Sequence, residues 1–238
     1  MKSLLAPALG KPFALLPRRF RFGAALALSR LLRPLIWRYR RHGRGIWLAG
    51  SYDESLRIVL RAMILSEVGF DPQLALDVPD TFVEEVRASG GLIVTGHFVL
   101  NALMTRHLHD QHIVATPIKT LPENDPWIWG TNVLADAVRP SQTVLVTIRD
   151  RLAVKRPAIV ALDSATPLPG GIPVETPAGP YSVSPAALIL ARRLGVPVWF
   201  ASVRARRHGP PLLFVRRIEP RIEEYVVLFR EQAAEVAR

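Results

Sequence analysis

The chain has 238 residues, 49% of them hydrophobic, which is enough for one sizeable core. It contains no cysteine, which excludes a disulfide, a thiolate zinc site and a cysteine nucleophile. The net charge is +11, and all of it lies in residues 1–50, which hold eleven Lys/Arg and no Asp/Glu. We therefore divide the chain into a basic arm, residues 1–50, and one balanced globular domain, residues 51–238.

The basic arm is apolar as well as charged. The stretch FGAALALSRLLRPLIWRYRRHGRG predicts a helix whose apolar stripe is formed by Leu28, Leu31, Leu32, Leu35, Ile36 and Tyr39. Such a helix either lies in an anionic membrane surface, which its arginines favour, or packs on its own domain. A nucleic-acid partner is less favoured. Because no uncharged apolar run reaches about 18 residues and no secretory signal is recognised, we expect a peripheral or monotopic protein on the cytoplasmic face of the inner membrane.

Helices and strands alternate along the rest of the chain. Capping residues, apolar periodicity and terminal glycines predict helices over 51–69, 79–89, 100–109, 125–138, 141–156 (favoured over a strand), 184–194 and from 221 onward. Short apolar runs predict strands over 92–95, 112–116, 157–163, 196–204 and 211–218. Residues 164–183, rich in proline and glycine, are interpreted as a long functional loop.

This alternation predicts an α/β domain with a mostly parallel mixed sheet covered by helices on both faces. Ligands of such sheets bind beyond the carboxyl ends of the strands. Two polar sites stand at predicted strand ends, Gly96–His97 and Asp163–Ser164. His97 is suited to take a proton from a hydroxyl or amine, or it only caps the strand. Asp163 positions a substrate or a loop, or it only forms a turn. Gly96 allows a sharp turn or a close approach.

The order of these segments resembles a known family. The segment GGLIVTGHFVLNALM is similar to G-x-(I/V)-x-x-x-G-H-F-G-N-W-E of the lysophospholipid acyltransferase superfamily, closest to its lipid A lauroyl/myristoyl acyltransferase branch. Residues 158–220 resemble that family's later block, in which a strand ends in Asp and is followed by a loop, a helix and A-R-x-x-G-x-P-V. The resemblance covers roughly residues 88–220 and implies a glycerolipid acyltransferase-like fold. It implies transfer of a fatty acyl group from a thioester of acyl carrier protein or coenzyme A to a hydroxyl or amine of a lipid-like acceptor.

The resemblance also implies that His97 is the general base and that a carboxylate five residues later orients its ring. Ala102 occupies that position, and Asn101 precedes it. We therefore name His97 and Asn101 as candidate catalytic residues, with Asp163 as the alternative orienting group. The candidate substrate-binding residues are Lys119, which stands near the place of a family arginine that steadies the oxyanion, Asp163 and Ser164. We expect no metal and no cofactor besides the acyl donor.

Three functions fit these observations. The chain is an active but divergent acyltransferase, a catalytically inactive acyltransferase-fold protein that binds lipid or acyl carrier protein as the partner of another enzyme, or an unrelated α/β enzyme with a similar strand order. The surroundings of the His97 ring distinguish the first two. A carboxylate within hydrogen-bond reach favours an active enzyme, and an apolar shell favours a retired site.

Overall fold

The computed structural model describes residues 76–118, 137–177, 179–206 and 210–237, with eight positions in the basic arm: 15–17, 20, 24, 27, 28 and 31. The predicted helix over 51–69, nearly all of the one over 125–138, and Lys119 lie outside the described residues. In the arm, the five described positions from Phe20 to Leu31 are helical. The rest of the predicted arm helix lies outside the described part.

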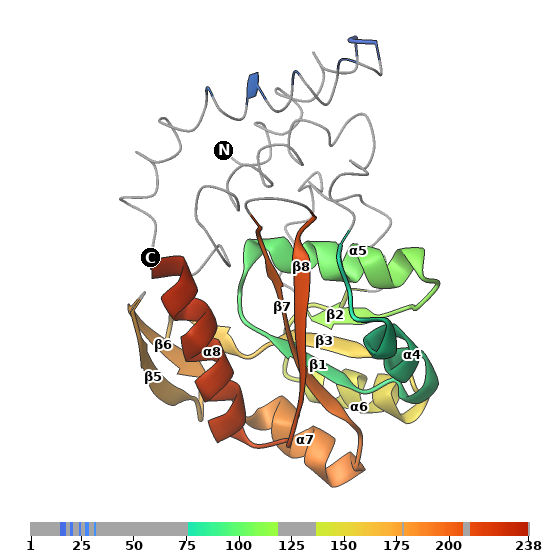
Figure 1. The fold of residues 1–238 in the computed structure, drawn as a ribbon. Helices are drawn as coiled ribbons and strands as arrows, with labels where there is room; N and C mark the ends of the chain where they lie inside the picture. Colours follow the sequence, from blue (N-terminus) through green and yellow to red (C-terminus); the bar gives the residue numbers. More distant parts are fainter. Residues whose placement is uncertain are drawn as a thin grey trace.

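The core of the domain is a five-stranded mixed sheet (Figure 1). Its strands are β1 (Leu92–Thr95), β2 (Thr116–Ile118), β3 (Ala158–Ala161), β7 (Val198–Arg204) and β8 (Leu212–Ile218), in the order β2-β3-β1-β7-β8. The first four run parallel, and β8 pairs antiparallel with β7. The predicted α/β class with a mostly parallel mixed sheet is therefore confirmed.

Helices cover both faces of this sheet (Figure 1). Successive side chains of β1 alternate: Leu92 and Val94 face one apolar cluster and Ile93 faces the other. The first cluster includes α6 (Val144–Ala153), α7 (Ala186–Leu194) and α8 (Ile222–Ala237). The second includes α4 (Asp80–Ser89) and α5 (Ala102–Asp110), which follows the 3₁₀ turn η2 (Val99–Asn101). Both faces being covered explains why β1 is buried along its whole length.

Two predicted segments were wrong. The strand expected over 112–116 begins only at Thr116, because His112 takes a left-handed conformation (φ 58°) that closes α5. The loop expected over 164–183 contains β5 (Ile172–Thr176) and β6 (Gly179–Val183). With β4 (Asp163–Ser164) they form a second, antiparallel sheet in the order β4-β6-β5.

Strands β5 and β6 of the second sheet were not predicted because they contain prolines, which are unusual inside strands. Pro173 lies in the edge strand β5, where a missing backbone donor is tolerated. Pro180 lies in β6 beyond the pairing with β4, which covers only Val183 and Ser182. The predicted strand over 157–163 is accordingly split at Leu162, where the chain leaves the main sheet for the second one.

Candidate active site

The site lies at the carboxyl edge of the main sheet, where β1 and β3 end side by side. Thr95 pairs with Ala161 in the parallel register, and the N–H of Leu162 donates to the carbonyl oxygen of Thr95 at 3.1 Å. Beyond this pairing, β1 continues into Gly96 and His97, and the segment after β3 continues from Leu162 into Asp163. The register of two neighbouring strands therefore brings together residues that are 66 positions apart in the sequence.

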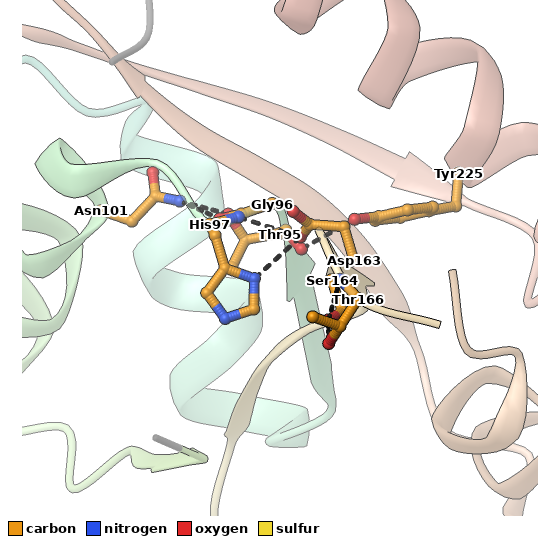
Figure 2. A network of polar contacts seen from close by, with 8 residues as sticks. All are labelled: Thr95, Gly96, His97, Asn101, Asp163, Ser164, Thr166 and Tyr225. Atoms are coloured by element: carbon orange, nitrogen blue, oxygen red, sulfur yellow. Dashed lines mark hydrogen bonds and ion pairs between the residues drawn. The ribbon is translucent and has the colours of Figure 1, made fainter. Parts of the chain in front are cut away.

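Asp163 contacts His97 twice (Figure 2). Its Oδ1 accepts the backbone N–H of His97 at 2.9 Å and lies 3.2 Å from Nδ1 of the imidazole. The His97 side chain is 65% exposed, and that of Asp163 is 1% exposed. A carboxylate at Nδ1 favours the tautomer with the proton on Nδ1, which makes Nε2 the proton acceptor. The pair thus has the geometry of a general base with a hidden orienting acid.

Tyr225 of α8 closes the buried side of this pair. Its hydroxyl donates to the carbonyl oxygen of Thr95 at 2.9 Å. Complete burial raises the pKa of the Tyr225 phenol well above its usual value, the charge of Asp163 raises it further, and the Leu162 N–H opposes them. The phenol therefore stays neutral beside the carboxylate. Tyr225 was not singled out from the sequence, because its spacing is that of any buried residue of an amphipathic helix.

Asn101 approaches the end of β1 from the other side (Figure 2). Its Nδ2 donates to the Thr95 hydroxyl and to the carbonyl oxygen of Gly96 at 2.9 Å, and its Oδ1 accepts the N–H of Val203 at 3.0 Å. These contacts tie β1 to β7. They give Asn101 a structural part instead of the orienting one that we expected, since its amide is committed to these three partners.

Gly96 permits two aromatic rings to approach the backbone closely. A Cβ at this position would lie 2.7 Å from the ring of Phe98 and 3.0 Å from that of Phe229. Its φ is not among the positive ones. The chain turns one residue later, where the N–H of Phe98 donates to the Gly96 carbonyl oxygen at 2.7 Å. Of the two reasons considered for this glycine, the structure therefore supports the close approach.

The other candidate binding residues have different surroundings. Ser164 accepts the N–H of Thr166 at 3.1 Å, and the two hydroxyls lie 3.0 Å apart, so Ser164 stabilises a local turn (Figure 2). Asp163, named both as a candidate substrate-binding residue and as the alternative orienting group, is buried, and its Oδ1 lies 3.2 Å from Nδ1 of the His97 ring. The structure does not describe Lys119.

No protein-family model matches this sequence, and no curated protein is significantly similar to it. Within the described residues, no helix is both long and apolar enough to span a bilayer. The same part of the chain holds no group of three or more His, Asp or Glu side chains arranged to bind a metal ion. The chemistry of the site follows from the geometry of the His97–Asp163 pair.

Proposed function

We propose that this chain is an acyltransferase that moves a fatty acyl group from a thioester of acyl carrier protein or coenzyme A to a hydroxyl or amine of a lipid-like acceptor. The observation that carries the proposal is the exposed His97 imidazole whose Nδ1 lies 3.2 Å from a buried carboxylate. In this proposal Asp163, the first residue of β4, supplies the acid that the family resemblance implies at position 102. The resemblance itself supports the reaction class.

The proposed reaction uses each nitrogen of the His97 ring. Nε2 takes the proton of the acceptor as its oxygen or nitrogen attacks the thioester carbonyl, and Asp163 stabilises the imidazolium through Nδ1–H. The tetrahedral intermediate then collapses, and the C–S bond breaks. The thiolate leaves and takes the proton from Nε2, so the products are an acyl ester or amide and a free thiol. General-base catalysis of this kind contributes about 10²–10⁴-fold to the rate.

The basic arm supports a lipid acceptor and a membrane location. Three described apolar side chains of the arm are strongly exposed: Leu15 by 87%, Leu31 by 76% and Phe20 by 53%. They lie in a segment with eleven basic and no acidic residues. Apolar side chains among arginines bind anionic lipid by burial and by charge together. We propose that the protein works peripherally on an anionic membrane surface, at the cytoplasmic face of the inner membrane.

The catalytic proposal is tested with purified full-length protein, acyl-CoA or acyl carrier protein thioester, and mixed lipid acceptors. Wild-type protein is expected to release thiol and form acylated lipid, and His97→Ala is expected to abolish both. The matched control is His109→Ala, since His109 is a surface histidine of α5 with a half-exposed side chain, and its loss is expected to leave the rate unchanged. Equal thiol release by wild type and His97→Ala would overturn the proposal. Binding of acyl carrier protein without turnover would favour the inactive binding protein instead.

The membrane proposal has a separate test. Full-length protein is expected to sediment with vesicles containing anionic lipid and much less with zwitterionic ones, and deletion of residues 1–46 is expected to abolish sedimentation. Replacing Arg40 and Arg41 with Gln in the full chain is expected to weaken it without removing any apolar residue. Sedimentation that is unchanged by both alterations would contradict the proposed role of the arm.

A further inference from the structure

We infer that Tyr225 is a positioning residue for the His97–Asp163 pair, because its hydroxyl fixes the junction between the two strand ends that carry them. The catalytic consequence rests on the proposed function. The structural consequence, the orientation of the His97 ring, does not. Tyr225 lies in α8, far along the chain from both residues.

The junction is a single carbonyl group that receives two donors. The carbonyl oxygen of Thr95 accepts the Tyr225 hydroxyl at 2.9 Å and the Leu162 N–H at 3.1 Å. Thr95 stands two residues before His97, and Leu162 immediately precedes Asp163. The Tyr225 hydroxyl and the Leu162 N–H therefore meet at one acceptor just before the two chain segments reach the pair. Figure 2 shows the Tyr225 hydroxyl directed at Thr95.

The Tyr225 ring is fully buried and packed against two aromatic rings. Its exposure is 0%, and it stacks on Phe229 with the ring centroids 5.6 Å apart and the planes at 12°. Phe200 meets it edge-on at 5.7 Å. Phe229 also lies against the position of Gly96, where a Cβ would come within 3.0 Å of its ring. The aromatic face of α8 is thus a rigid support under the corner that presents His97.

The Tyr225 hydroxyl donates to Thr95 and not to Asp163, so the hydrogen bonds described for Asp163 all come from His97. Tyr225 donates its proton to Thr95, and Oδ2 of Asp163 is buried without a hydrogen-bond partner among the described residues. The two described donors to Asp163, the backbone N–H and Nδ1 of His97, both contact Oδ1. A carboxylate whose hydrogen bonds are directed at one residue orients that residue more strongly than one whose charge is shared among several donors.

Tyr225→Phe tests the inference, since it keeps the ring and its stacking and removes only the hydroxyl. ¹⁵N NMR of the full chain, with the His97 signals assigned by their loss in His97→Ala, reports the tautomer and the pKa of His97. We expect a lower pKa and a larger share of the Nε2–H tautomer, because the Nδ1–Oδ1 contact loosens. In the transfer assay, kcat is expected to fall on the order of tenfold with little change in KM, because the base is displaced but remains present.

Ser202→Ala is the matched control. The buried Ser202 hydroxyl donates to Gln232 of α8 at 2.9 Å, so this variant also deletes one hydroxyl that links α8 to the sheet, away from the pair. It is expected to lower the thermal midpoint about as much as Tyr225→Phe while leaving the tautomer and pKa of His97 as in wild type.

The outcomes separate the inference from the proposed function. A folded Tyr225→Phe whose His97 keeps the wild-type tautomer and pKa would overturn the inference, whatever its transfer rate. Full activity of His97→Ala would overturn the proposed function. It would leave the positioning inference standing if the pKa of His97 is shifted in Tyr225→Phe. If Tyr225→Phe does not fold, Phe229→Leu provides the second test, since it removes the stacking ring and is expected to shift His97 in the same direction by less.

Discussion

Two polar corners flank the end of β1, and they differ in how completely their hydrogen bonds are used. On the β7 side, the side-chain amide of Asn101 donates to Thr95 and Gly96 and accepts from Val203, so all of its polar groups are hydrogen-bonded. On the β3 side, Oδ2 of Asp163 has no partner among the described residues, and the His97 ring is 65% exposed. A saturated corner of this kind is a structural joint. A corner with a carboxylate oxygen that lacks a described hydrogen-bond partner, next to an exposed imidazole, has the groups that a proton transfer needs.

Asp163→Asn is expected to have the largest effect of the substitutions that test this comparison. The substitution keeps the shape of the side chain but removes the charge that favours the Nδ1–H tautomer. We expect kcat/KM for acyl transfer to fall by about 10⁴-fold. The urea midpoint is expected to stay the same or rise, because a buried charge with an unpartnered oxygen is replaced by a neutral group. A rate loss below tenfold would show that Asp163 is not the orienting acid.

Asn101→Ala breaks the other corner. It leaves the Val203 N–H without its acceptor and takes a donor from the Gly96 carbonyl oxygen. We expect the free energy of unfolding to fall by about 2–4 kcal/mol, measured by urea denaturation. The loss of kcat at a temperature where the variant is folded should be much smaller than for Asp163→Asn. If the stability is unchanged and the activity is lost, the roles of the two corners are exchanged.

Gly96→Ala strains the residue that the two corners share. The added Cβ would stand 2.7 Å from the Phe98 ring, so the ring or the backbone must move. We expect a destabilisation of about 1–2 kcal/mol by urea denaturation, with a modest loss of transfer activity. A variant as stable and active as wild type would mean that the Phe98 ring, and the Phe229 ring of α8 at 3.0 Å from the added Cβ, move aside easily, which would weaken the case for a rigid support.

The smallest expected effect concerns His107 on α5, the helix that begins after Asn101. Burial lowers the pKa of His107 below 6.5, and Asp110 partly opposes this. The folded chain therefore binds fewer protons at this site than the unfolded chain, so the free energy of unfolding decreases as the pH falls from about 6.5 through the lowered pKa. His107→Gln should make this decrease shallower in pH-dependent thermal melts. An equally steep decrease in the variant would assign it to other groups.

The sequence patterns predicted the strand over 92–95 and the helices α6 and α7, whose periodicity and end signals are local. They also identified His97 and Asp163 as residues at strand ends. Asp163 was named as an alternative orienting group for His97, but the sequence could not choose it over Asn101, because the contact depends on β1 and β3 being neighbours in register. Asn101 was misjudged for a local reason. It lies in a 3₁₀ turn, where each residue rotates further than in an α-helix and spacing arguments fail.

The imidazole and its acid belong to different sheets: His97 follows β1 of the main sheet, and Asp163 begins β4 of the small antiparallel one. The small sheet in turn is linked to α8, where Arg230 donates to the carbonyl oxygen of Glu175 at 3.1 Å. The contact between the imidazole and the carboxylate therefore depends on how the two sheets pack against each other. A shift of the small sheet relative to the main one would move Asp163 away from His97 without anything touching the ring.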